Sequence, residues 1–210
     1  MGRILMEQQK IEVIIKFLKN NIEPIEDSFY GYGYRASAYL VDGTFLPCVI
    51  FRNPTKIIEL AIKRFNDEQS GKSIYKNSSN GYQEIVKNFV SKGNCVNDYD
   101  IARVEKSKFA FPLSILKQIK GETTMSWTGF AIKMKDGKYF GFGTTFLMDF
   151  FQMPENYSVS DIDEIINHSY VLKTGELRSH KVPFFTPPDD YNDAVIYRER
   201  PFFECYIDDL

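Results

Sequence analysis

Two Asp-Gly dipeptides, each set between runs of β-forming residues, constrain the fold of this chain more than any other feature. Asp42-Gly43 divides the run YRASAYLVDGTFLPCVIFR, and Asp136-Gly137 divides the segment from Trp127 to Phe146. Such a dipeptide between two apolar runs is a strong signal for a β-hairpin, because glycine readily adopts the positive φ that tight turns require. The sequence therefore predicts two antiparallel hairpins.

The length of the second turn decides which residues share a face of the sheet. A two-residue turn would place both phenylalanines of YFGF on one surface with Lys133 and Lys135. A three-residue turn ending in a left-handed Gly137 would instead turn both rings toward an apolar face. In that register the pairs are Ile132 with Phe140 and Phe130 with Phe142. We favour it because burying each phenylalanine contributes about 1.5–3 kcal/mol.

The stretch KYFGFGTTF is also close to the RNA-reading strand of RNA-recognition domains, in which aromatic rings stack on bases. The second aromatic strand that this motif needs is missing upstream, where EKSKFAFP lies. The formal net charge of −2 and the pI of about 5.8 give no global positive field that would attract nucleic acid or an anionic membrane. We therefore expect no nucleic-acid partner.

Helical periodicity predicts helices that flank these hairpins. Isoleucine and leucine at 11, 14, 15 and 18 indicate an N-terminal helix over about 4–20. Asn53-Pro54 is typical of a helix start, and the helix that follows would bury a stripe. That stripe consists of Ile58, Ala61, Ile62 and Phe65. Further helices are expected over 80–93, after Pro112 and after Ser160.

Strands complete the expected architecture. A strand is expected over about 100–106, a weaker hairpin in YVLKTGELRSH, and one or two closing strands interrupted by Pro201. No flexible linker divides the chain, and we see no convincing internal repeat beyond the two Asp-Gly turns. The sequence thus predicts a single α+β domain over 1–210, with a mostly antiparallel sheet built from Asp-Gly hairpins and flanked by helices.

The cysteines and histidines give no catalytic signature. Cys48, Cys95 and Cys205 are odd in number and widely spaced, which argues against a disulfide framework or a zinc site and favours a cytoplasmic location. His168 and His180 are the candidate general bases, and no local motif accompanies them. We predict no catalytic residue, metal or cofactor, and no membrane span. Convergence of dispersed acids, cysteines or histidines in space is left open.

Three groups of residues are candidates for binding. Tyr30, Tyr32 and Tyr34 recur at period two, which would place them with Arg35 along one strand. Glu122 and Trp127 precede a strand, where binding loops often lie. The acidic region over 186–210 forms the third group. Its candidate residues are Arg198, Arg200, Asp208 and Asp209.

From these features we expect a non-enzymatic protein-interaction module, whose role could be that of an immunity-like or antitoxin-like inhibitor or a defence accessory protein. Its partner would be a protein, and the sequence leaves a homo-oligomer open. The alternative is an enzyme acting on nucleic acid or nucleotides through carboxylates and lysines gathered in space. Three or more acids with a lysine around one cavity would favour the enzyme, whereas a flat acidic and aromatic surface would favour the inhibitor.

Overall fold

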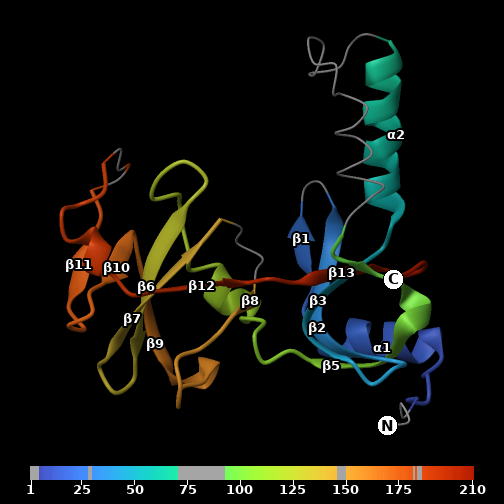
Figure 1. Cartoon of the computed structure of the whole chain (residues 1–210), viewed down its shortest axis with the longest axis horizontal. Helices are drawn as coiled ribbons and strands as arrows, with labels where there is room; N and C mark the ends of the chain where they lie inside the picture. Colours follow the sequence, from blue (N-terminus) through green and yellow to red (C-terminus); the bar gives the residue numbers. More distant parts are fainter. Residues whose placement is uncertain (1–4, 28–29, 71–92, 146–149, 182, 184–185) are drawn as a thin grey trace. The chain divides into compact units, whose positions relative to one another are not determined.

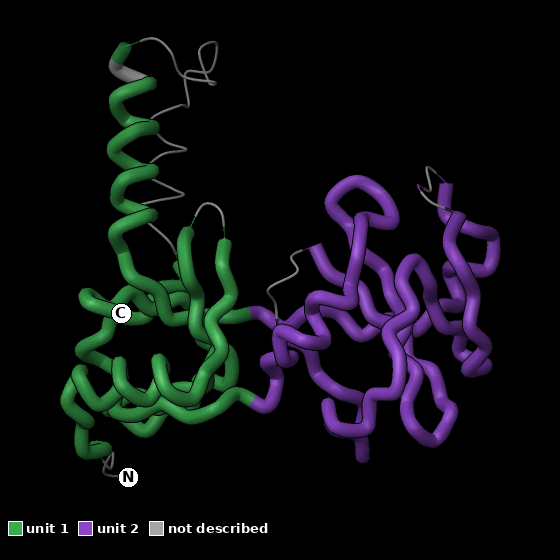
Figure 2. Tube along the Cα trace, turned by 180° about the vertical axis from the view of Figure 1, so that it is seen from behind, with its two compact units in different colours: residues 1–107, 202–210 green, residues 108–201 purple. Residues whose placement is uncertain are grey.

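The chain divides into two compact units (Figures 1 and 2). The computed structural model describes residues 5–27, 30–70, 93–145, 150–181, 183 and 186–210. Unit 1 comprises 1–107 and 202–210, and unit 2 comprises 108–201. The described residues form mostly strands and few helices, arranged in several sheets. Among the described helices, none combines the length and the apolar character that a membrane span requires. The single-domain expectation remains a prediction.

Unit 1 is a mixed sheet with helices. Its elements are α1 (Ile11–Asn21), β1 (Ile25–Asp27), β2 (Gly31–Leu40), β3 (Phe45–Arg52), α2 (Thr55–Gln69), β4 (Cys95–Val96), the 3-10 turn η2 (Asp98–Asp100), β5 (Ile101–Lys106) and β13 (Phe203–Tyr206). The strands lie in the order β5-β2-β3-β13-β4, and β1 also pairs with β2. β13 runs parallel to β3 and β4, and the other pairs are antiparallel.

One face of the unit 1 sheet is covered by α1. Ile14 and Leu18, one turn apart, are fully buried against Ala36, Val49 and Phe51 of the sheet. This spacing places both side chains on the same helix face, so their burial fixes the rotation of α1 about its axis.

Unit 2 has its own sheet. Its elements are α4 (Leu113–Leu116), β6 (Thr128–Met134), β7 (Tyr139–Thr144), β8 (Phe150–Phe151), η3 (Val159–Asp161), β9 (Ile162–Asn167), β10 (Ser169–Val171), β11 (Leu177–Ser179), η4 (Tyr191–Asp193) and β12 (Ile196–Arg200). The strands lie in the order β9-β6-β7-β12-β8, while β10 and β11 form a separate pair. β12 is parallel to β7, and the other pairs of this sheet are antiparallel.

The turn between β6 and β7 sets the register of that pair. Gly137 has φ +87°, and its N–H donates to Met134 O at 2.8 Å. The observed pairs are Ile132 with Phe140 and Phe130 with Phe142, as a three-residue turn requires. Phe142 is 2% exposed and stacks on Phe130, whereas Phe140 is only half-buried. The expected burial of Phe140 is therefore only partly met.

The alternation of phenylalanine and glycine in β7 has a packing reason. Because side chains alternate across a strand, Gly141 and Gly143 lie on the face opposite the two phenylalanines. A Cβ at Gly143 would lie 2.1 Å from a ring carbon of Trp127, and one at Gly141 would lie 2.7 Å from Val195 O. These glycines let an indole ring and a backbone segment approach the sheet directly.

The two units share one strand order. In each, a strand pair joined by an Asp-Gly turn is central, with β2-β3 in unit 1 and β6-β7 in unit 2. The first strand of the pair has an antiparallel neighbour, β5 or β9, and the second has a parallel neighbour, β13 or β12. The units differ at the outer strand, since β4 is parallel to β13 but β8 is antiparallel to β12.

Several expected elements differ from those observed. α1 begins at Ile11, not near residue 4, and residues 5–10 are not helical. The helix expected after Ser160 is instead the turn η3 followed by β9, an edge strand with isoleucine at 162, 165 and 166. β-branched residues favour a strand, and the acids Asp163 and Glu164 are typical of an exposed edge. The helix expected over 80–93 lies outside the described residues, apart from Gly93.

Candidate functional site

A groove of about 510 Å³ lies beside α1 in unit 1, within the range of ligand-binding clefts. We call it the α1 groove. Its lining residues are Ile11, Glu12, Ile15, Lys16, Lys19, Asn20, Asp98, Ile207, Asp208 and Asp209. Three isoleucines supply apolar surface, and the ionisable residues comprise four acids and two lysines.

The helical repeat explains how α1 forms one wall of this groove. Ile11, Ile15 and Lys19 follow one another at four-residue spacing, so they lie along one line of the helix. Ile14 and Leu18 are buried in the sheet core beside that line, while Ile11 and Ile15 are only partly buried. The apolar stripe of α1 is therefore wider than the sheet covers, and its outer edge lines the groove.

The C-terminal residues form the opposite wall. Ile207 is buried, and its N–H donates to Arg52 O at 2.9 Å. Lys19 Nζ donates to Asp209 O at 2.9 Å, which ties α1 to the C-terminal residues. Asp209 has φ +66°, a left-handed conformation that aspartate and asparagine tolerate better than most residues. The exposed carboxylates of Asp208 and Asp209 thus lie at the rim of the groove.

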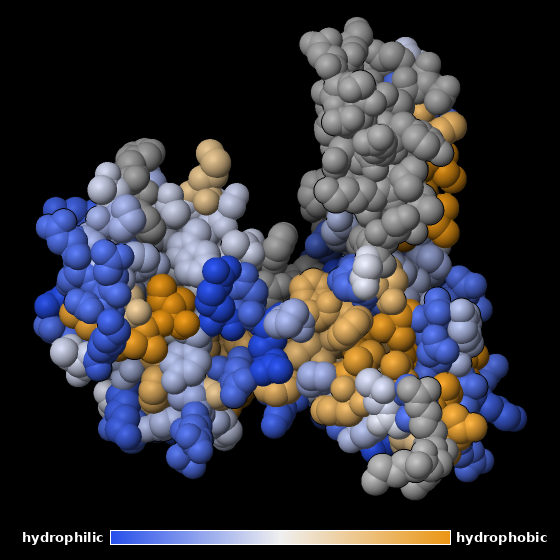
Figure 3. Space-filling view, viewed as in Figure 1, coloured by the Kyte–Doolittle hydropathy of each residue, from blue (hydrophilic) through white to orange (hydrophobic). Residues whose placement is uncertain are grey.

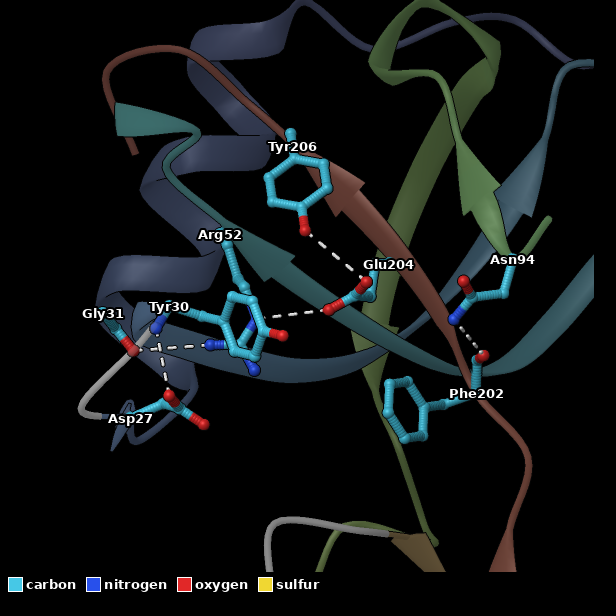
Figure 4. Close-up of polar contacts among 8 residues, drawn as sticks. All are labelled: Asp27, Tyr30, Gly31, Arg52, Asn94, Phe202, Glu204 and Tyr206. Carbon is cyan, nitrogen blue, oxygen red and sulfur yellow. Dashed lines mark hydrogen bonds and ion pairs between the residues drawn. The ribbon is translucent and has the colours of Figure 1, made fainter. Parts of the chain in front are cut away.

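A buried ion pair holds the strand that leads into this wall (Figure 4). Arg52 of β3 and Glu204 of β13 are 3% and 5% exposed, and Arg52 Nε lies 3.7 Å from Glu204 Oε1. Arg52 also donates to Gly31 O at 3.4 Å, and Tyr206 donates to Glu204 Oε2 at 3.5 Å. Removing one partner of a buried pair leaves an uncompensated charge, so this pair anchors β13 against β3.

The structure separates the tyrosines that the sequence placed together. Tyr34 packs against the core under α1, whereas the ring of Tyr30 lies 5.4 Å from the guanidinium carbon of Arg52. Tyr32 is 57% exposed, and Arg35 is buried. The left-handed Gly31, with φ +73°, lies between Tyr30 and Tyr32 and takes Tyr30 out of the period of two, which Tyr32 and Tyr34 keep along β2.

In unit 2, the structure brings Trp127 together with Arg198. The guanidinium carbon of Arg198 lies 5.0 Å from the centre of the indole ring, a cation–π contact. Arg200 instead donates to Gln152 Oε1 at 2.5 Å and lies over a different ring, that of Phe109. Glu122 is exposed in the loop before β6.

The two histidines lie side by side in unit 2. His180 N–H donates to His168 O at 2.8 Å, and His168 adopts a left-handed φ of +52°. His168 comes directly after the strand β9, whereas the sequence had predicted that it follows a helix. Burial, with a smaller electrostatic contribution from His168, lowers the pKa of His180 to about 4. His180 is thus a neutral, buried side chain near neutral pH.

The ring of Tyr170 lies against this histidine, and its hydroxyl bonds to an ion pair of Asp190 with Arg178. The rings of Tyr170 and His180 are 4.6 Å apart, and Tyr170 Oη donates to Asp190 Oδ1 at 2.5 Å. Burial and this hydrogen bond raise the pKa of Tyr170 to about 12. The same hydrogen bond, together with one from Arg178, lowers the pKa of Asp190. At neutral pH the phenol is protonated and the carboxylate is charged, so the Tyr170 hydrogen bond and the ion pair between Arg178 and Asp190 are both present.

The three cysteines belong to unit 1, whereas both histidines belong to unit 2. Cys48 and Cys205 are buried and Cys95 is exposed. Burial raises the pKa of Cys205 to about 12, so its thiol is a poor nucleophile. Among the residues that the structure describes, no three histidine, cysteine or acidic side chains are grouped so that they could hold a metal ion.

The sequence indicated only part of the α1 groove. Asp208 and Asp209 were candidates, and the helix was expected, but its groove-lining residues and Asp98 were missed. One sequence signal pointed to the groove: the apolar stripe at 11, 14, 15 and 18 is wider than the surface that a helix buries against one sheet face. The position of the chain end beside α1 depends on a strand pairing between residues about 150 apart, β13 with β3, which no local pattern reveals.

Comparison of this chain with protein-family models, with curated proteins and with solved structures found no match.

Proposed function

We propose that this chain is a protein-interaction module that binds a basic segment of a partner protein in the α1 groove. The observation that carries the proposal is the combination of an apolar lining, contributed by Ile11, Ile15 and Ile207, with four acids at one groove. Aliphatic side chains of a partner would bury against the isoleucines, and its lysines or arginines would face the acids.

The charge balance of the groove favours a basic occupant over an acidic one. Glu12, Asp98, Asp208 and Asp209 contribute four negative charges, and Lys16 and Lys19 contribute two positive charges, which leaves a net charge of −2. One lysine already donates to the backbone at Asp209. Exposed charges of this kind accelerate encounter and select partners more than they add affinity, and their effect falls as salt is added.

The proposal can be tested with a short lysine–leucine peptide and its glutamate–leucine counterpart. We expect the wild-type chain to bind the basic peptide, with affinity that falls as salt rises, and not the acidic one. Asp208→Asn combined with Asp209→Asn keeps the side-chain shape and suits the left-handed backbone, and should weaken binding roughly tenfold. Glu155→Gln, an exposed acid of unit 2, is the matched control.

An inhibitor role would follow if the partner's basic segment belonged to its own active surface. Cross-linking in the source cell would then recover a partner with the wild-type chain and with Glu155→Gln, but not with the doubly substituted chain. Equal binding of both peptides, or equal binding by the doubly substituted chain, would contradict the proposal.

The enzymatic alternative has one observation in its favour. Four acids and two lysines surround one groove, which is the composition expected of an enzyme that acts on nucleotides or nucleic acid. However, Glu12, Asp208 and Asp209 are exposed to water, whereas active sites usually exclude water from the reacting groups. Hydrolysis of nucleotides or single-stranded nucleic acid with added Mg²⁺ or Mn²⁺, abolished by Asp98→Asn, would favour the enzyme.

A further inference from the structure

An apolar stripe is exposed along α2, away from the α1 groove residues. The sequence pattern predicted a buried stripe there, and the structure corrects that expectation. Ile58, Ile62 and Phe65 are 52%, 56% and 43% exposed. Figure 3 shows hydrophobic atoms along the side of this helix. Contiguous exposed apolar residues on a helix are typical of an interaction surface.

The first turn of α2 packs against the rest of unit 1. Ile57 is buried, at 8% exposure, while its neighbour Ile58 belongs to the exposed stripe. Helical geometry places these two residues about 100° apart, so the anchored side and the exposed stripe are distinct faces of one helix. The stripe spans eight residues, or about 12 Å at 1.5 Å per residue.

We propose that α2 pairs antiparallel with α2 of a second copy of this chain. A twofold axis between Ala61 and Ile62 brings residue n level with residue 123 − n of the other copy. Ile58 then lies level with Phe65 of that copy, and Ile62 lies level with Ala61. Each apolar side chain of the stripe therefore meets an apolar position across the pair.

The charges beside the stripe are complementary under the same symmetry. Glu59 and Lys63 lie on one flank of the stripe, about 100° and 140° around the helix from Ile58. In an antiparallel pair, equivalent flanks of the two helices face each other. Glu59 of one copy then lies within about one residue rise, 1.5 Å along the axis, of Lys63 of the other, and the contact occurs twice. Both residues are exposed, and Glu59 contacts Lys56 at 3.5 Å within its own chain.

This symmetry makes the proposal sharply testable by charge reversal. We expect the wild-type chain to show a concentration-dependent dimer in sedimentation velocity and Ile62→Asp to abolish it. Glu59→Lys alone gives one copy two basic residues on this flank, and Lys63→Glu alone gives it two acidic residues. Each should raise the dimer dissociation constant roughly tenfold, because two attractive contacts become repulsive.

An equimolar mixture of these two variants is the decisive sample, since each repulsive flank is then matched with its opposite. We expect a 1:1 heterodimer at concentrations where each variant alone is a monomer. Glu155→Lys is the control for added charge, and Asp208→Asn with Asp209→Asn should leave the dimer unchanged. A wild-type monomer at all accessible concentrations, a dimer that survives Ile62→Asp, or a mixture that stays monomeric would each overturn the proposal. Circular dichroism verifies that every variant is folded.

Discussion

Gly143 provides the most direct test of how unit 2 is packed. The change G143A places a methyl group where two ring carbons of Trp127 lie at 2.1 and 2.5 Å, well inside ordinary contact distance. Movement of the ring is opposed by its own contacts, because the guanidinium carbon of Arg198 lies 5.0 Å from the ring centre and the ring also lies near Gly129. Overpacking of this kind typically costs about 1–3 kcal/mol.

The net loss of stability on G143A should be about 2 kcal/mol, because a small gain from the stiffer unfolded chain offsets part of the clash. For a chain of this length the melting temperature should fall by about 4–8 °C. Gly93, whose Cβ would meet nothing within 4 Å, is the matched control, and G93A should be close to neutral.

A double-mutant cycle identifies the cause of the G143A effect. In a Trp127→Ala background the ring is gone, so the same methyl group should cost much less. Urea unfolding of the four proteins measures the coupling. An unchanged melting temperature for G143A, or an equal cost with and without the indole, would refute the reasoning that the glycines of β7 are there for close packing.

Two further predictions concern buried titratable groups. The pKa of His180 is about 4 in the folded chain, below its ordinary value of 6.5, so its stabilising contribution is complete above pH 6.5. As the pH falls toward 4, the free energy of unfolding should therefore decrease by about 3 kcal/mol in all. Urea titrations over this pH range should show a smaller decrease for His180→Gln than for the wild-type chain. A thiol reagent should label one thiol of the native chain, Cys95, while Cys48 and Cys205 react only after unfolding. Rapid labelling that persists in Cys95→Ser would contradict the burial of the other two.

Local patterns predicted most of the elements well. The strand β5, the pair β10-β11, the short helix after Pro112 and the break at Pro201 lie where turn residues and periodicity indicated. The pairing of Ile132 with Phe140 followed from one glycine, because the turn alone sets the register of an antiparallel pair. The sequence carries this information within a few residues of each element.

The errors have a common physical origin in tertiary context. Ile162, Ile165 and Ile166 fit a helix face as well as a strand, and pairing of β9 with β6 decided for the strand. The apolar residues of α2 have helical spacing, but spacing alone does not show whether the rest of the fold covers them, and here it leaves them exposed. The α1 groove depends on β13 beside β3, a pairing between distant segments.

The C-terminal run of the chain is divided between the sheets of the two units. β12 and β13 are separated by only Pro201 and Phe202, yet β12 pairs with β7 and β13 pairs with β3 and β4. Proline has no N–H to donate, so it ends one ladder and lets the next begin. β13 lies inside the unit 1 sheet, between β3 and β4, so that sheet cannot be completed until the residues after unit 2 have joined it. The wall of the α1 groove, which begins at Ile207 immediately after β13, therefore forms only when this last, most non-local pairing is made.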